Sequence, residues 1–239
     1  MKNQKYNFSY NSSSTESVRA ELGTIEKDAS GFNGLFKPES FRGEEIIRKL
    51  LTKDFSTVLD IGAGKKAQAD FLSLRGKKVY TNGITKGSNA LDFYDYEGDF
   101  NSIDFDKEFD VSLCSHVLEH QLNTHQFLEN VVSVTKENGY IVIIVPPRKP
   151  FIIGGHVSIW NAGLVLYHLI LAGVDCSVEC NIKQYDYNIG IIVKNVAIKE
   201  DIKKIITFDG GDIDNFLSKY FPIDNAHDGF NGDIMELNW

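Results

Sequence analysis

Short apolar runs alternate with amphipathic segments through the middle of the chain. Residues 140–145 are apolar at almost every position, which is typical of a strand buried on both faces of a sheet. Similar runs predict further strands, the last two of them antiparallel across a short turn. The expected strands span residues 57–61, 78–81, 91–96, 110–114, 140–145, 176–182 and 189–198.

Between these runs, apolar residues recur at intervals of three and four, which predicts helices. Asn123 is a suitable N-cap for one of them, and Gly173 is placed to end another. The expected helices span residues 38–51, 67–74, 123–134 and 161–172. Strands that alternate with helices predict an α/β fold with a doubly wound, mostly parallel sheet.

The two ends of the chain differ from this pattern. Residues 1–36 are polar and rich in Asn and Ser, and we interpret them as a lead segment or a lid. Residues 37–198 hold the alternating elements. Residues 199–239 form a C-terminal extension with many apolar residues, which we expect to dock on the domain or to build a homodimer contact.

Composition and net charge argue against several classes of function. The chain has 239 residues and a formal net charge of −8, which argues against nonspecific nucleic-acid binding. No apolar run reaches the roughly 20 residues of a membrane span, and the first residues lack the apolar core of a signal peptide. Three cysteines that form no CxxC pair are typical of a reducing, cytoplasmic protein and provide no zinc site.

The first predicted strand leads into an acid and two glycines: Asp60, Gly62 and Gly64. With Ala67, this spacing also satisfies a dinucleotide-binding fingerprint. That interpretation needs an acid after the second strand, and the chain has Asn82-Gly83 there. Asp60 would also repel a pyrophosphate, whereas it would hold a cationic or hydroxyl-bearing ligand.

Ligands of parallel α/β sheets bind at the carboxyl ends of the strands, so the residues that follow each strand are the candidates. Besides Asp60 and its glycines, these are Asn82, Asp99, Phe100, Ser115, His116, Glu119, His120 and His156.

Two segments together resemble the class I S-adenosylmethionine-dependent methyltransferases, in their small-molecule branch. The first runs from Val58 to Gly64, and the second from Phe109 to His120 as FDVSLCSHVLEH. Gly155-His156-Val157 and the helix after it are similar to the same branch. The resemblance implies a seven-stranded, Rossmann-like sheet whose last strand is antiparallel, with S-adenosyl-L-methionine as the cofactor.

The resemblance also implies roles for single residues. Asp60, Gly62 and Gly64 would line the methionine part of the cofactor. Asp99 and Phe100 would sit at the adenine, and Ser115 and His116 near the amino-acid end. Two positions depart from the family: Lys66 stands where a third glycine is common, and Gly83 stands where an acid usually holds the ribose. Asn82 is the substitute that we assign to the ribose hydroxyls.

His156 is our candidate general base, because it follows the fifth strand, where the acceptor binds in this fold. A structural histidine that orders the loop is an equally open interpretation. His120 is a second candidate, although it and Glu119 are also expected to buttress the cofactor loop. The run from His116 to His120 matches the HxxEH pattern of inverted zinc proteases, which would need a long helix. We assign no metal ligand.

These observations predict a methyltransferase that acts on a small acceptor, with an oxygen of a sugar or surface-glycan precursor as the preferred site. A non-catalytic binding or scaffold protein that retains the fold is the alternative.

Overall fold

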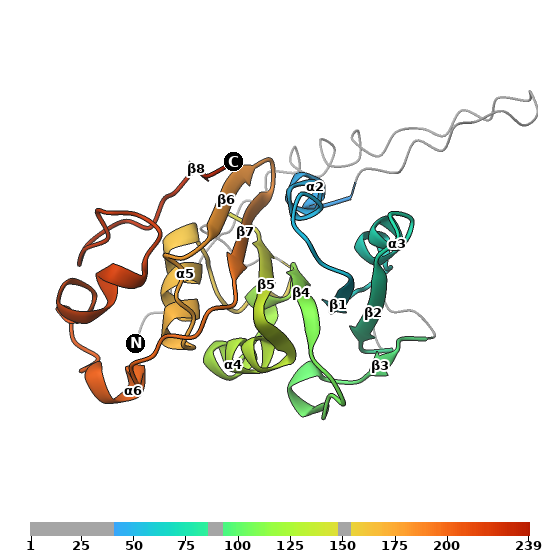
Figure 1. The fold of residues 1–239 in the computed structure, drawn as a ribbon, viewed down its shortest axis with the longest axis horizontal. Coiled ribbons are helices and arrows are strands. Elements are labelled where there is room, and N and C mark those ends of the chain that lie inside the picture. Colours follow the sequence, from blue (N-terminus) through green and yellow to red (C-terminus); the bar gives the residue numbers. More distant parts are fainter. Residues whose placement is uncertain (1–40, 86–92, 148–153) are drawn as a thin grey trace, which may run out of the picture. The chain divides into compact units, whose positions relative to one another are not determined.

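A computed structural model describes residues 41–85, 93–147 and 154–239, which all belong to one compact unit. Within them, eight strands form one sheet in the order β3-β2-β1-β4-β5-β7-β6-β8 (Figure 1). The strands are β1 (Thr57–Ile61), β2 (Lys78–Gly83), β3 (Tyr96–Glu97), β4 (Phe109–Ser115), β5 (Thr135–Val145), β6 (Cys180–Tyr185), β7 (Asn188–Lys194) and β8 (Glu236–Leu237).

The first five strands of the sheet are parallel, and β7 runs antiparallel to both β5 and β6. This arrangement confirms the predicted mostly parallel sheet with an antiparallel last strand. The short strand β8 pairs with the outer edge of β6 and adds a member that the sequence pattern did not predict.

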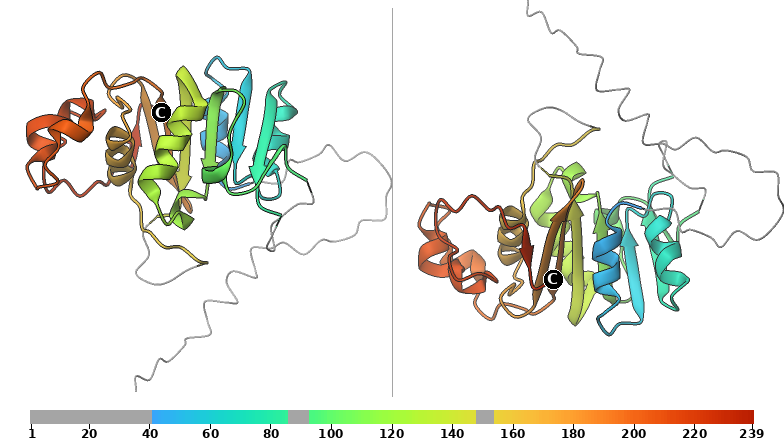
Figure 2. Two further views of the ribbon diagram at one scale, coloured as in Figure 1. Left: turned by 90° about the horizontal axis from the view of Figure 1, so that it is seen from below. Right: turned by 90° about the horizontal axis from the view of Figure 1, so that it is seen from above.

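Helices cover both faces of the sheet, as the two views of Figure 2 show. One face packs against α2 and α3, and the other against α4 and α5. The helices are α2 (Glu44–Leu50), α3 (Ala67–Ser73), α4 (Thr124–Val134), α5 (Ala162–Leu171) and the short α6 (Ile202–Ile205). Short turns of helix complete the set: η1 (Phe100–Ser102), η2 (Leu118–His120), η3 (Ile213–Leu217) and η4 (Ser218–Tyr220).

Strand β5 shows why its sequence is apolar throughout. Ile141, Ile143 and Val145 pack toward α4 and α5, whereas Val142 and Ile144 pack toward α2 and α3. Successive side chains of a strand point to opposite faces, so a strand covered on both sides needs apolar residues at every position.

Asp110 fixes the start of β1 against β4. Its Oδ2 accepts hydrogen bonds from the backbone N–H groups of Ser56 and Thr57 at 2.9 and 2.8 Å, and from the Thr57 hydroxyl at 3.0 Å. Its Oδ1 accepts from Lys136 Nζ at 2.7 Å. Burial alone would raise the pKa of this carboxyl, but these four donors together hold it well below its usual range.

The predicted helix starts at Asn123 and Asn161 are confirmed. The Asn123 side chain accepts from the backbone N–H of Gln126, and that of Asn161 accepts from Leu164 N–H at 2.8 Å. Each satisfies a backbone donor that has no partner inside its helix.

Several boundaries differ from the prediction. Helix α2 begins only at Glu44, because Gly43 before it has a left-handed φ of +81°. Strand β5 begins at Thr135 rather than at residue 140, and Asn138 within it has a φ of +62° that accompanies a register shift against β4. Strand β6 begins at Cys180 rather than at residue 176, and residues 38–40, 91 and 92 lie outside the described segments.

The C-terminal residues pack on the domain. Leu217, Tyr220 and Phe221 are buried in the same core as α4 and α5. The Gly163 N–H donates to the Gly232 carbonyl at 2.8 Å, and a Cβ on Gly163 would lie 2.5 Å from the Gly232 Cα. Glycine at position 163 therefore lets the C-terminal chain approach the backbone of α5.

None of the helices in the described segments combines the length and the apolar character needed to cross a membrane.

Replacing Gly163 by Val should force the C-terminal chain away from α5, because the new side chain overlaps the Gly232 backbone. We expect a loss of about 1–3 kcal/mol in the free energy of unfolding by urea. Leu164→Val introduces the same residue at a neighbouring exposed position and should change stability by less than about 0.5 kcal/mol. Equal stability of the two variants would contradict the tight backbone contact.

Candidate active site

Four adjacent parallel strands, β2, β1, β4 and β5, end at the same edge of the sheet. The chain leaves β1 toward β2 on one side, and β4 lies on the other side, so the order of strands reverses between β1 and β4. Such a reversal is where ligands bind in open α/β sheets. The residues after β1 and after β4 therefore define the centre of the site.

Asp60 lies in β1 and is 1% exposed. Its Oδ2 has no hydrogen-bond partner among the described residues. Burial raises the pKa of this carboxyl to about 7, and nearby Asp70 adds to the rise, whereas a hydrogen bond from the Ala69 backbone and the charge of Lys66 oppose it. A cationic group of a ligand would favour the charged carboxylate and supply the missing partner.

The loop after β1 has the backbone that its glycines permit. Gly62 and Gly64 have φ angles of +68° and +49°, and a Cβ on Gly62 would lie 2.6 Å from a methyl carbon of Val117. Lys66 shares the left-handed conformation, with φ of +63°. The third position of the motif thus keeps the backbone that a glycine would adopt most easily, although the residue is lysine.

The surroundings of Gly83, at the end of β2, explain why this position does not hold the acid that is usual in the family. The Tyr94 ring lies against this glycine, so that a Cβ there would sit 2.5 Å from the ring. The Tyr94 hydroxyl donates to the Gly64 carbonyl at 3.0 Å and ties this ring to the glycine loop. An aromatic side chain therefore occupies the place into which an acid at position 83 would extend.

Asn82 is buried, and its amide donates to the carbonyls of Tyr96 and Gly98 at 3.0 and 3.1 Å. These bonds hold the ends of β2 and β3 together. Both side-chain N–H groups thus have backbone partners, and the contact of Asn82 with the ribose stays a prediction.

Asp99 and Phe100 follow β3. The Asp99 carboxylate caps η1 by accepting from the Asn101 backbone N–H at 3.1 Å. The Phe100 ring is buried against Phe105 and Phe127, with ring centroids 5.4 and 5.3 Å away. Phe100 therefore contributes to the core, and the adenine contacts of both residues stay predictions.

Ser115 ends β4, and Gln68 on α3 donates to its hydroxyl at 3.2 Å. The next residue, His116, has a left-handed φ of +56° and donates its N–H to the Ile144 carbonyl. Its Nε2 lies 3.1 Å from Asn188 Oδ1, and its ring stacks on Tyr187 at 6.3 Å. Gln68, Asn188 and Tyr187 were not predicted, because they come from α3, from β7 and from the turn before β7 rather than from the ends of parallel strands.

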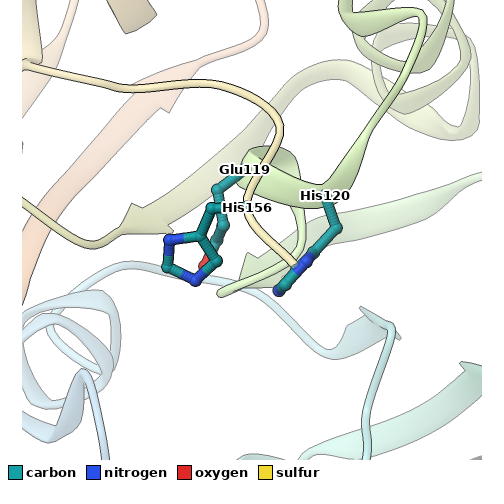
Figure 3. A group of neighbouring side chains, drawn as sticks. All are labelled: Glu119, His120 and His156. Atoms are coloured by element: carbon teal, nitrogen blue, oxygen red, sulfur yellow. The ribbon is translucent and has the colours of Figure 1, made fainter. Parts of the chain in front are cut away.

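Glu119 lies next to three imidazoles, and we call His116, Glu119, His120 and His156 the histidine cluster. His116 Nδ1 and His156 Nε2 lie 3.3 and 3.9 Å from Glu119 Oε1. The rings of His120 and His156 are 5.0 Å apart (Figure 3). Strand-end loops that are far apart in sequence thus bring both predicted catalytic histidines together.

Backbone contacts hold the two loops of the cluster together. The Val157 N–H donates to the Glu119 carbonyl at 2.9 Å, and His120 Nδ1 lies 3.2 Å from the Gly155 carbonyl. Burial lowers the pKa of His156 below its ordinary value, and His120, His116 and Arg42 act in the same direction, whereas Glu119 opposes them. His156 is therefore largely neutral at pH 7 and has a free lone pair.

The backbone conformation of residues 116–120 contradicts the interpretation as an HxxEH zinc-protease motif. Only Leu118–His120 are helical, in one turn of 3₁₀-helix, and His116 lies outside it with a left-handed φ. The two histidines therefore do not lie one helical turn apart on a long helix, which that class of zinc protease requires.

The sheet order and the residues at its edge define a cofactor-binding α/β domain of the kind that the resemblance implies. Comparison with known proteins makes the class specific: residues 59–143 match the family model of a methyltransferase domain. This match supports the class I, S-adenosylmethionine-dependent methyltransferase fold that the sequence motifs predicted.

Two curated relatives are ubiquinone biosynthesis O-methyltransferases. That of Rickettsia prowazekii (strain Madrid E) is 30% identical over 150 residues, which cover 56% of this chain and 60% of the relative. That of Rickettsia felis (strain ATCC VR-1525 / URRWXCal2) is 27% identical over 150 residues, covering 56% and 62%. The chain thus spans about 60% of the length of these relatives.

Among solved structures, the 1,6-didemethyltoxoflavin-N1-methyltransferase of Burkholderia thailandensis aligns with a TM-score of 0.52 at 14% identity. The alignment covers 64% of this chain and 76% of that protein. At this identity the likeness shows the fold alone.

The Asp60 carboxyl should make stability fall as pH rises. Unfolded, it releases its proton near pH 3.8, and folded near pH 7, so the folded state binds more protons between these values. Asp60→Asn removes this effect. In urea unfolding of the ligand-free proteins, the free energy of unfolding of Asp60→Asn relative to that of the wild type should rise by about 2 kcal/mol from pH 5 to pH 8. Parallel pH curves would contradict the raised pKa. Asp224→Asn, which removes an exposed carboxyl of the C-terminal extension that is not among the causes of the Asp60 shift, is the control.

The steric cost of the left-handed backbone at residue 66 can be measured with two variants that both remove the lysine charge. Lys66→Gly should be more stable than Lys66→Ala by about 1 kcal/mol, because only glycine adopts this conformation without steric cost. Urea unfolding of both variants at pH 5.5 gives the difference. Equal stability would show that residue 66 is not held in the left-handed region.

Proposed function

We propose that the protein is an S-adenosylmethionine-dependent methyltransferase that methylates a hydroxyl oxygen of a small acceptor. The observation that carries the proposal is Asp60. This buried carboxyl, with an unpartnered oxygen, lies at the strand-order reversal beside two glycines of positive φ. A site of this kind fits a ligand that is cationic and needs close approach to the backbone.

The residues present fit the proposed cofactor, which carries a sulfonium and an ammonium group. When bound, it would supply an electrophilic methyl group. Asp60 would stabilise the positive charge, and Gly62 and Gly64 would let the backbone approach the ligand. Asp99 would accept from the adenine amine beyond the end of β3. The protein's main contribution to rate would be the alignment of the acceptor with the methyl group.

His156 is the proposed proton acceptor on the acceptor side. Its lowered pKa leaves the ring neutral at pH 7, so it can take the proton of an acceptor hydroxyl. The positive charge that forms on the ring would be stabilised by Glu119, whose Oε1 lies 3.9 Å from His156 Nε2. His120, 5.0 Å from His156 between ring centroids, would help to orient it.

The names of the Rickettsia relatives support oxygen as the methylated atom, since both are O-methyltransferases. A sugar or surface-glycan precursor as acceptor, and a homodimer as the assembly, stay predictions. The alternative is a non-catalytic protein that retains the fold. The replacement of the ribose-binding acid by Gly83 and the Tyr94 ring is the observation that favours it.

Calorimetric titration with S-adenosylhomocysteine tests the proposal. We expect micromolar binding to the wild type and roughly 10- to 100-fold weaker binding to Asp60→Asn, because a charge-assisted contact is lost. Asp224→Asn changes an exposed carboxyl of the C-terminal extension and should bind like the wild type. Asp60→Ala should weaken binding far more than His156→Ala does.

Absence of binding at millimolar ligand would overturn the enzyme interpretation and favour the scaffold. If the ligand binds, transfer of labelled methyl groups to a panel of phenols, catechols and sugars identifies the acceptor class. Full turnover by His156→Ala would show that His156 is not the base.

A further inference from the structure

Glu119 is the least explained side chain of the described molecule. It is fully buried, and neither carboxylate oxygen accepts a hydrogen bond from a described residue. A buried acid without a partner is costly, since its lost hydration is not replaced. The surroundings are not apolar, however: imidazoles of His116 and His156 face the same oxygen at 3.3 and 3.9 Å.

Glu119, His120 and His156 each offer one ligand atom, and these atoms all lie within 4.8 Å of one another. Figure 3 shows the Glu119 carboxylate beside the His156 ring, with His120 directed to the same space. Two histidines and one carboxylate are the ligand set of several catalytic zinc sites and of other divalent transition-metal sites. Ligand atoms around one zinc ion lie about 3–3.5 Å apart, so the three side chains would have to move about 1 Å closer together to bind one ion.

The supports of these side chains suit metal binding. Glu119 and His120 are neighbours on η2, and the hydrogen bond from Val157 N–H to the Glu119 carbonyl fixes the His156 loop beside them. His120 Nδ1 lies 3.2 Å from the Gly155 carbonyl. When this nitrogen donates to a backbone carbonyl, the ring's other nitrogen is left for an ion, which is the usual arrangement of metal-binding histidines.

We propose that Glu119, His120 and His156 bind one divalent transition-metal ion, with Zn²⁺ as the best match. The ion would be the missing partner of the buried carboxylate. Three protein ligands leave a coordination position free, and the site lies at the carboxyl edge of β4 and β5, where the acceptor is expected. An acceptor hydroxyl that coordinates there would ionise more easily and release its proton to solvent water. His156 would then be a ligand rather than a free base.

Only this catalytic role rests on the proposed function; the binding of the ion does not. The full chain, purified without a histidine tag and stripped with a chelator, is titrated with Zn²⁺ by calorimetry and with Co²⁺ by visible absorption. We expect one ion per chain. Glu119→Gln, His120→Ala and His156→Ala should each weaken binding by at least about 100-fold, the upper end of what loss of a mere supporting contact costs.

His125→Ala is the matched control, because His125 lies on the exposed side of α4 beside Glu129 and belongs to no such cluster. It should bind zinc like the wild type. Circular dichroism verifies that each variant folds, and Glu119→Gln keeps the side-chain volume while removing the buried charge. Failure of the wild type to bind either ion below about 100 μM, or equal binding by Glu119→Gln and His125→Ala, would overturn the proposal.

Titration of the metal-free protein with S-adenosylhomocysteine separates the two proposals. Binding of the nucleoside without binding of the ion leaves the methyltransferase proposal standing and removes the metal. Binding of the ion without the nucleoside does the reverse.

Discussion

The pairing of β1 with β4 is the interaction on which the candidate site depends. Asp110 fixes the beginning of this pair by accepting from the backbone of Ser56 and Thr57, and the register then carries Asp60 to a position beside Leu113. A parallel pair must end at one edge, so the glycine loop and the histidine cluster emerge next to each other. A one-residue slip would turn Asp60 to the opposite face. The polar contacts at the start of the strands therefore help to determine the chemistry at their ends.

Much of the fold could be predicted because the sheet is covered on both faces. Apolar runs such as β1 then stand out, and Asn123 and Asn161 mark helix starts by their capping chemistry. The missed parts depend on tertiary contacts. Strand β8 has two residues and exists only because β6 offers an open edge, and the C-terminal chain is held by the backbone contact at Gly163.

The candidate site could be predicted only where a position follows directly from a parallel strand. Asp60 and His116, which lie at the ends of β1 and β4, were chosen as candidates in this way, and His156 was chosen because its loop follows β5. The Tyr94 ring beside Gly83 could not be found, because nothing in the local pattern shows that an aromatic side chain returns over a glycine. Contacts from β7 to His116 were missed for the same reason: antiparallel pairing brings them to the edge from another direction.

Asp60 and Glu119 are both buried acids with oxygens that accept no hydrogen bond from the described residues, but their surroundings differ. The causes of the raised pKa of Asp60 are burial and the neighbouring acid Asp70, and no imidazole is among them, which suits a soft organic cation that arrives with its own apolar surface. Glu119 has imidazole nitrogens around it, which suit a small ion with fixed coordination. One edge of one sheet thus offers two distinct places for positive charge. Under the proposed function, a methyl donor and an acceptor oxygen would meet at this edge, and group transfer between two bound partners would require such a separation.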